Sequence, residues 1–162
     1  MIPQAGTYLD RLAAQLGGPV ASRLPTAYEQ ACMLREPMHL RAVRVEFERA
    51  AARRVEENQA LRGLFLRGAQ LPGLSLAHRK AWSEAAATQD ADLSVSALQA
   101  GNDLLRGLLV ELHAVLEAMT QDDQAAPQAA PSSSEEITVL LEAVWLELRC
   151  STERRRLPSD RF

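Results

Sequence analysis

Residues 95–119, VSALQAGNDLLRGLLVELHAVLEAM, carry apolar side chains at intervals of three and four residues. The stripe consists of Val95, Leu98, Leu105, Leu109, Leu112, Leu116 and Met119. That spacing places its members on one face of an α-helix, and such a face is normally buried against other elements. We therefore expect a central core helix over residues 94–120, with Asp92 or Ser94 as its N-terminal cap.

Helical spacing continues through most of the remaining chain. It predicts three further main helices, over residues 37–68, 75–88 and 134–152. Ala and Leu supply 27 and 25 of the 162 residues, whereas aromatic residues make up 4%, and this balance favours helix over sheet. The predicted fold class is all-α: a helical bundle of four main helices plus a short helical N-terminal segment packed across them.

The N-terminal segment is expected to contain two short helices. The first is amphipathic and covers residues 5–16, and the sequence Gly-Gly-Pro at 17–19 is expected to stop it. Thr26 and Glu29 have the spacing of a capping box, which predicts the start of the second.

Four parts are predicted along the chain. Residues 1–120 form the bundle core, and the polar, proline-containing segment 121–134 is a flexible linker. Residues 135–153 form a C-terminal helix that docks either on the bundle or on a second subunit, and both arrangements satisfy the sequence. Residues 154–162 form a basic tail, which begins with three arginines.

A nine-residue segment occurs twice in the chain. Residues 58–66, NQALRGLFL, and residues 102–110, NDLLRGLLV, are identical at five of nine positions. We interpret them as two related helices of a pseudo-symmetric bundle. The repeat includes Gly63 and Gly107, each inside a predicted helix where glycine is unfavourable, and a close helix crossing would explain both.

Two asparagines lie on the apolar stripes of these related helices. Asn102 follows Leu98 by four residues, and Asn58 precedes Leu61 by three. A buried amide is unfavourable unless its donors and acceptor find partners, so each asparagine is expected to hydrogen-bond across the helix interface. In one interpretation the pair fixes the register of the two helices, as a core asparagine does in coiled coils.

The other interpretation is a polar pocket between the related helices. Asn58, Arg62, Asn102 and Arg106 would hold a carboxylate or phosphate there, because guanidinium groups bind such anions bidentately. His113, two turns beyond Arg106, would line the same pocket. These five residues are the candidate ligand-binding residues, and their ligand would be an anionic small molecule.

The predicted C-terminal helix offers candidate interface residues. Leu141, Trp145 and Leu148 recur at helical spacing on its narrow apolar face. Tryptophan frequently dominates the binding energy of protein interfaces, so this face is a candidate for contact with a protein partner or a second copy.

Motifs for metal, cofactor or covalent chemistry are sparse. The chain has no glycine-rich phosphate loop and no GxSxG nucleophile motif, and its single Glu-x-x-His sequence, Glu36 to His39, contains a proline. Cys32 and Cys150 lack the spacing of a zinc site. We expect no catalytic residue, no metal and no cofactor.

Charge and hydropathy bear on partners and location. The net charge is −3, with +3 on residues 1–68 and −6 on residues 69–162, which is not the basic footprint of a nucleic-acid-binding protein. The start of the chain lacks the basic and apolar regions of a secretory signal, and no apolar run has the length of a membrane span. We expect a cytoplasmic protein that binds neither nucleic acid nor membrane.

The sequence favours a non-catalytic assembly, adaptor or accessory protein that acts through protein–protein contacts, including self-association as a homo-oligomer. Amphipathic helices are abundant in it, and motifs for site chemistry are scarce. The alternative is a helical-bundle protein or enzyme that binds an anionic small molecule between the two related helices.

Overall fold

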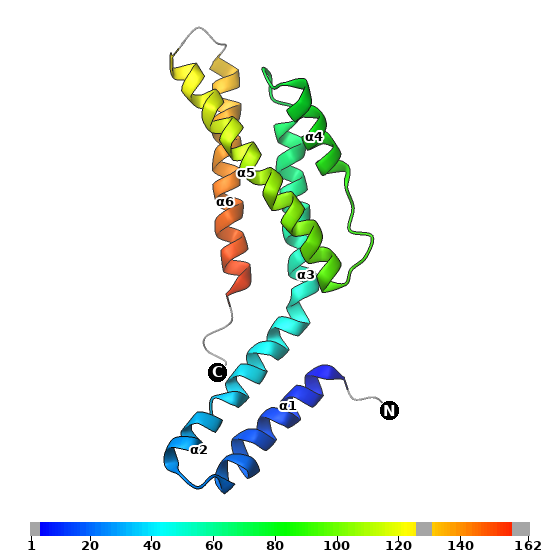
Figure 1. Cartoon of the computed structure of the whole chain (residues 1–162). Coiled ribbons are helices and arrows are strands. Elements are labelled where there is room, and N and C mark those ends of the chain that lie inside the picture. The colour runs from blue at the N-terminus through cyan, green and yellow to red at the C-terminus, as the bar shows by residue number, and fades with distance from the viewer. Residues whose placement is uncertain (1–3, 126–130, 157–162) are drawn as a thin grey trace. The chain divides into compact units, whose positions relative to one another are not determined.

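The computed structural model describes residues 4–125 and 131–156, without the side chains of residues 122–125 and 131–133. Every regular element in these ranges is helical, which confirms the predicted all-α fold (Figure 1). The helices are α1 (Ala5–Gln15), α2 (Ala27–Met33), α3 (Glu36–Gly68), α4 (Leu76–Ala87), α5 (Val95–Ala125) and α6 (Pro131–Arg155). Helices α3 to α6 correspond to the four predicted main helices.

The chain divides into two compact units. The N-terminal unit contains α1, α2 and the part of α3 that ends at Ala50. The C-terminal unit, Ala51–Arg155, contains the rest of α3 together with α4, α5 and α6. The four-helix assembly therefore lies within Ala51–Arg155, whereas the sequence led us to expect a core over residues 1–120.

In the N-terminal unit, α1 ends at Gln15, just before the Gly-Gly-Pro sequence at 17–19, as expected, but the chain continues in helical turns of other types. Leu16–Val20 continue as a π-helical turn, and Ala21–Arg23 follow as a 3-10 turn. A Cβ atom at Gly17 would lie 2.9 Å from Cγ of Pro37, so the missing side chain permits this contact with the start of α3.

Side-chain caps fix several helix starts. The predicted capping box is confirmed: the Thr26 hydroxyl accepts a hydrogen bond from the Glu29 N–H, and the Glu29 carboxylate accepts one from the Thr26 N–H. Ser75 caps α4. Ser94 caps α5 by accepting from the N–H three residues on, while the Asp92 carboxylate accepts from the Ser94 N–H.

All four helices of the C-terminal unit contribute to one hydrophobic core. Its most deeply buried large side chains are Phe65, Trp82, Leu112, Leu116 and Val144, each 0% exposed. They come from α3, α4, α5 and α6, and α5 packs along α6 in Figure 1. Helix α6 therefore packs on its own chain, and Leu105, Leu109, Leu112 and Leu116 of the predicted α5 stripe lie in this core. Val95, the first residue of that stripe, is exposed instead.

The predicted linker is partly helical. Helix α5 continues to Ala125 and α6 begins at Pro131, so both helices extend into the segment 121–134. The middle of that segment, residues 126–130, lies outside the described residues. The predicted basic tail begins within the last turn of α6, and residues 157–162 also lie outside the description.

The proposed close helix crossing at the repeated glycines is wrong. A Cβ atom added to Gly63 or Gly107 would meet no atom within 4 Å. The close approach lies instead at Gly68, the last residue of α3, where a Cβ atom would be 3.0 Å from Cδ1 of Leu112 and 3.2 Å from Cε3 of Trp82. The pseudo-symmetry of the two repeated segments is not confirmed.

Candidate functional site

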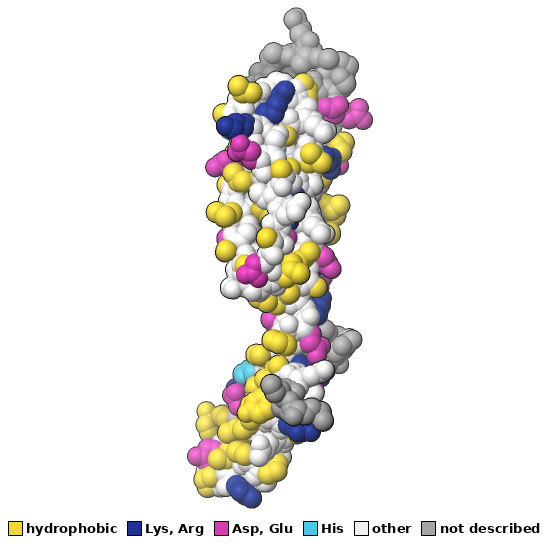
Figure 2. Space-filling model, turned by 90° about the vertical axis from the view of Figure 1, so that its right-hand side faces the viewer, with side chains coloured by type: hydrophobic (Ala, Val, Ile, Leu, Met, Phe, Trp, Pro, Cys, Tyr) yellow, Lys and Arg dark blue, Asp and Glu magenta, His cyan; other side chains and the backbone are white. Residues whose placement is uncertain are grey.

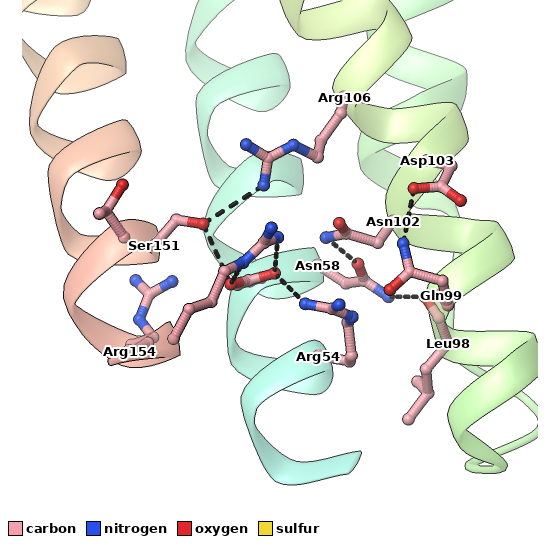
Figure 3. Close-up of polar contacts among 12 residues, drawn as sticks. Arg54, Asn58, Leu98, Gln99, Asn102, Asp103, Arg106, Ser151 and Arg154 are labelled. Atoms are coloured by element: carbon pink, nitrogen blue, oxygen red, sulfur yellow. Dashed lines mark hydrogen bonds and ion pairs between the residues drawn. The ribbon is translucent and has the colours of Figure 1, made fainter. Parts of the chain in front are cut away.

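A buried asparagine pair joins α3 to α5. Asn58 and Asn102 are both 0% exposed, and Nδ2 of Asn102 donates to Oδ1 of Asn58 at 2.9 Å (Figure 3). Nδ2 of Asn58 donates in turn to Oδ1 of Asp90 at 2.9 Å and to the Leu98 carbonyl at 3.3 Å. The expected hydrogen bond between the two helices is thus present. Through Asn58 it is linked to a second hydrogen bond, to a carboxylate in the segment between α4 and α5.

That carboxylate is paired with Arg62. The Arg62 guanidinium donates to both oxygens of Asp90, at 2.7 and 2.8 Å, and its Nε donates to the Thr88 hydroxyl at 3.0 Å. The hydrogen bonds from Arg62 lower the pKa of Asp90 against the opposing effect of its burial, and Asn58 adds to the lowering. A bidentate pair of this kind is what an anionic ligand would otherwise form with Arg62.

A second polar network centres on Glu57, which is 1% exposed. Arg155 of α6 donates to both of its carboxylate oxygens, at 3.0 and 3.1 Å, and Arg54 donates to one of them at 2.9 Å. The Ser151 hydroxyl donates to Glu57 at 3.0 Å and accepts from Nη1 of Arg106 at 3.3 Å (Figure 3). The network therefore ties the C-terminal end of α6 to the middle of α3.

The environment of Glu57 favours its ionised form. Burial alone would raise the pKa of this carboxyl group. The hydrogen bonds from Arg155 and Ser151, together with the positive charges of Arg155 and Arg54, outweigh burial and leave the pKa below its ordinary value. Glu57 is thus a buried carboxylate with its charge compensated within the chain.

The five predicted ligand-binding residues lie in three surroundings. Asn58, Asn102 and Arg62 come together around Asp90. Arg106 contacts Ser151 and so belongs to the Glu57 network. His113 packs its ring edge-on against Trp145, with ring centroids 5.2 Å apart. Its Nδ1 atom lies 3.7 Å from Oε2 of Glu117.

The sequence analysis did not identify Asp90 or Glu57 as residues of these polar networks. Glu57 carried a detectable signal, because it precedes Leu61 by four residues and so lies on a buried stripe next to Asn58. Asp90 lies in a non-helical segment without periodicity, so spacing gave no indication that it would meet Arg62.

The predicted interface residues lie on a partly exposed face of α6. Trp145 is 52% exposed, whereas Leu141 and Leu148 are half-buried against the core. Trp145 borders two surface hollows. One, of about 300 Å³, is lined by Arg106, Leu109, Val110, His113, Val144, Trp145 and Leu148. The other, of about 460 Å³, is lined by Arg67, Val139, Glu142, Ala143, Trp145, Leu146 and Arg149.

We call the surface around these two hollows the Trp145 face. It consists of the exposed apolar residues Val110, Val139, Trp145 and Leu146 and the arginines Arg67, Arg106 and Arg149. Val110 is 70% exposed and Leu146 54% exposed, so apolar surface extends from α6 onto α5. Figure 2 shows that hydrophobic side chains are also exposed among charged ones on the side where α4 lies.

The described residues contain no group of three or more His, Cys, Asp or Glu side chains arranged to hold a metal ion. Cys32 and Cys150 are free thiols. No helix in the described ranges is both long enough and apolar enough to cross a membrane.

Comparison with known proteins finds no family model, no curated protein and no solved structure that matches this chain.

Proposed function

We propose that this protein is a non-catalytic assembly or adaptor protein, and that the Trp145 face makes its contacts with another polypeptide. The observation that carries the proposal is the position of Trp145. Its indole ring is half exposed between two hollows, and apolar side chains of α5 and α6 continue the surface on both sides. A large aromatic side chain with apolar neighbours and a charged rim is the usual composition of an interface centre.

The energetic argument rests on the area that remains exposed. Burial of a large aromatic side chain dominates the energetics of many interfaces, and Trp145 still has about half of its surface in contact with solvent. Val110 and Leu146 are also more than half exposed. A partner that covered these side chains would remove apolar area from water, at about 25 cal/mol for each Å².

The alternative, an anionic ligand between the repeated helices, has weaker support from the geometry. Asn58 and Asn102 bond to each other, and Asp90 already occupies both outer nitrogens of Arg62. The remaining candidates, Arg106 and His113, share the hollow of about 300 Å³ beside Trp145. A small carboxylate held there would give a thermal shift that Arg106→Ala abolishes, while the melting temperature of the free protein falls only slightly because one hydrogen bond to Ser151 is lost.

Native mass spectrometry of the protein purified gently from its own host tests the proposal. We expect a complex with a polypeptide, which Trp145→Ala weakens or abolishes. Leu76→Ala is the matched control, because Leu76 is an apolar residue 82% exposed at the start of α4 and outside the Trp145 face. A complex that withstands Trp145→Ala, or a bare monomer in every preparation, would overturn the proposal. A small-molecule adduct lost in Arg106→Ala would favour the alternative.

A further inference from the structure

The N-terminal unit lacks a core of large buried side chains. Among the described residues 4–50, the buried ones are Ala13, Ala21, Pro37 and Ala50. The leucines, valines, tyrosines and the phenylalanine of this stretch are all half-buried or exposed. A domain normally consists of two packed layers of secondary structure around one core. These residues therefore form a single layer, whose apolar side chains still need a second layer to cover them.

Helix α1 and the part of α3 that ends at Ala50 form an antiparallel hairpin (Figure 1). A Cβ atom at Gly6 would lie 3.3 Å from Nε of Arg44, and the Asp10 carboxylate pairs with the same arginine at 3.1 Å. Gly17, just beyond α1, lies against Pro37 at the start of α3. Residue numbers thus rise along α1 as they fall along α3. These contacts define the line along which the two helices meet.

One side of this hairpin is apolar along both helices. At about 100° per residue, three leucines of α1 point about 70–130° away from the contact line, and three apolar residues of α3 point about 60–120° away from it. Because the helices are antiparallel, both rotations lead to the same side. We call this surface the hairpin face. It consists of Leu9, Leu12, Leu16, Leu40, Val43 and Phe47.

The hairpin face carries little charge. No charged residue lies on it between Leu40 and Phe47, a stretch that the structure describes in full. Arg44 of the same stretch points to the contact line, where it pairs with Asp10 and Glu48. Nucleic acids, anionic membranes and charged peptides are recognised through arrays of charge, which this face does not offer. An occupant of the face must instead present an apolar surface of its own.

The exposed area of the hairpin face matches what a dimer needs. Phe47 is 63% exposed, Val43 is 54% exposed, and Tyr8, which borders the face on α1, is 59% exposed. The two aromatic side chains alone leave about 200–300 Å² in contact with solvent. With Val43 and the four half-buried leucines, the exposed apolar area is on the order of 500 Å². A homodimer interface of standard size buries about 800 Å² on each partner, of which about 65% is apolar.

We propose that the hairpin faces of two copies of this chain pack on each other and form a twofold dimer. The four helices would then make a bundle in which each hairpin provides one of the two layers. A twofold interface uses the same patch on both subunits, and a face with little charge meets its own copy without repulsion. This contact goes beyond the proposed function, because it does not use the Trp145 face. The dimer would carry two Trp145 faces, one from each copy.

Sedimentation velocity of the full-length protein tests the proposal. We expect a species of twice the chain mass of 17.8 kDa, which added salt does not dissociate because the contact is apolar. Val43→Glu with Phe47→Glu should leave only monomer, since it places negative charges on both facing surfaces. Met38→Glu is the matched control and should keep the dimer. Met38 is apolar and 44% exposed, and it lies nine residues before Phe47, about 180° around α3.

A second variant, Val43→Ala with Phe47→Ala, guards against loss of the helix, because alanine is the strongest helix former. Its dimer should dissociate at least about tenfold more readily than that of the wild type. Circular dichroism checks that each variant keeps the helical content of the wild type.

The outcomes separate this contact from the proposed function. Wild type that stays monomeric up to about 1 mM, the range of the weakest specific contacts, would overturn the inference. So would a glutamate variant that remains dimeric, or a dimer that Met38→Glu dissociates. Trp145→Ala should keep the dimer, and its dissociation by that substitution would assign the contact to the wrong surface. A monomer that binds a different polypeptide through Trp145 would refute the dimer and leave the proposed function standing.

Discussion

Nδ2 of Asn102 donates to Oδ1 of Asn58 across 2.9 Å in a part of the core where neither side chain is exposed. Nδ2 of Asn58 donates in turn to Asp90, which also accepts hydrogen bonds from Arg62. A chain of hydrogen bonds thus runs from α5 through α3 to the segment after α4 and ends at an ion pair near the surface. Such a chain favours a single register of α3 against α5, because a shift of either helix would leave buried amides without partners.

Asn102→Leu should destabilise the protein by about 1–3 kcal/mol. The substitution removes the donor to Oδ1 of Asn58 and leaves that oxygen buried without its partner from α5. Urea denaturation followed by circular dichroism measures the loss. Gln59→Leu is the control, because Gln59 is exposed and lies beside Asn58 on α3. Equal effects of the two substitutions would show that the asparagine pair does not stabilise the contact.

Glu57→Gln should destabilise the protein by about 2–3 kcal/mol at neutral pH. The change leaves the charges of Arg54 and Arg155 without the carboxylate that they share. Glu56→Gln is the matched control, since Glu56 is the preceding residue and is exposed. Denaturant unfolding of the three proteins at pH 7 gives the comparison, and similar stabilities for both variants would contradict the importance of the network.

The same pair of variants predicts a pH dependence. The folded state holds the pKa of Glu57 below its ordinary value of 4.5, so its ionised form stabilises the fold above that pH. This contribution is lost as the pH falls from about 4.5 through the lower pKa of the folded state. Glutamine does not titrate, so the stability difference between wild type and Glu57→Gln should shrink over that acidic range. A difference that stayed constant down to pH 2 would contradict the lowered pKa.

Hydrophobic periodicity in the sequence was sufficient to predict the four main helices. The spacing of Leu105, Leu109, Leu112 and Leu116 has one low-energy interpretation in water, a helix with that face buried, and all four are in the core. The capping box of Thr26 was predictable for a similar reason, because both of its hydrogen bonds join residues three apart. Local rules succeed where both partners of a contact are close in the sequence.

The polar contacts of the candidate site depend on distant partners. Arg62 and Asp90 are separated by 28 residues, and Glu57 and Arg155 by 98. No local pattern selects these partners, since they follow from how α3 lies against the segment after α4 and against α6. The residue types indicated that Asn58 and Arg62 needed partners, but they did not indicate that the chain supplies an internal carboxylate.

The glycines give a prediction that reverses the one suggested by the repeat. Gly107→Ala should stabilise the protein by about 0.5–1 kcal/mol, because glycine is unfavourable within a helix and the added methyl group enters open space. Gly68→Ala should destabilise it instead, since its Cβ would press on Leu112 and Trp82. Thermal melts of both variants provide the measurement. Two shifts of the same sign would contradict the packing at the end of α3.

Arg62 and Arg106 occupy matching positions of the repeated segments, yet they should contribute differently to the free energy of unfolding. Arg62→Ala leaves the Asp90 carboxylate, 11% exposed, without its bidentate partner, which should cost about 2 kcal/mol or more. Arg106→Ala removes one hydrogen bond of 3.3 Å to a hydroxyl group, which should cost about 0.5 kcal/mol.

The double-mutant cycle with Asp90→Ala separates the ion pair from general truncation effects. The coupling energy between Arg62 and Asp90 should be at least about 1 kcal/mol, since they are in direct contact, while Arg106 and Asp90 should show coupling near zero. Equal costs for the two arginines, together with equal couplings, would mean that the repeated segments play equivalent roles and that the ion pair does not set Arg62 apart.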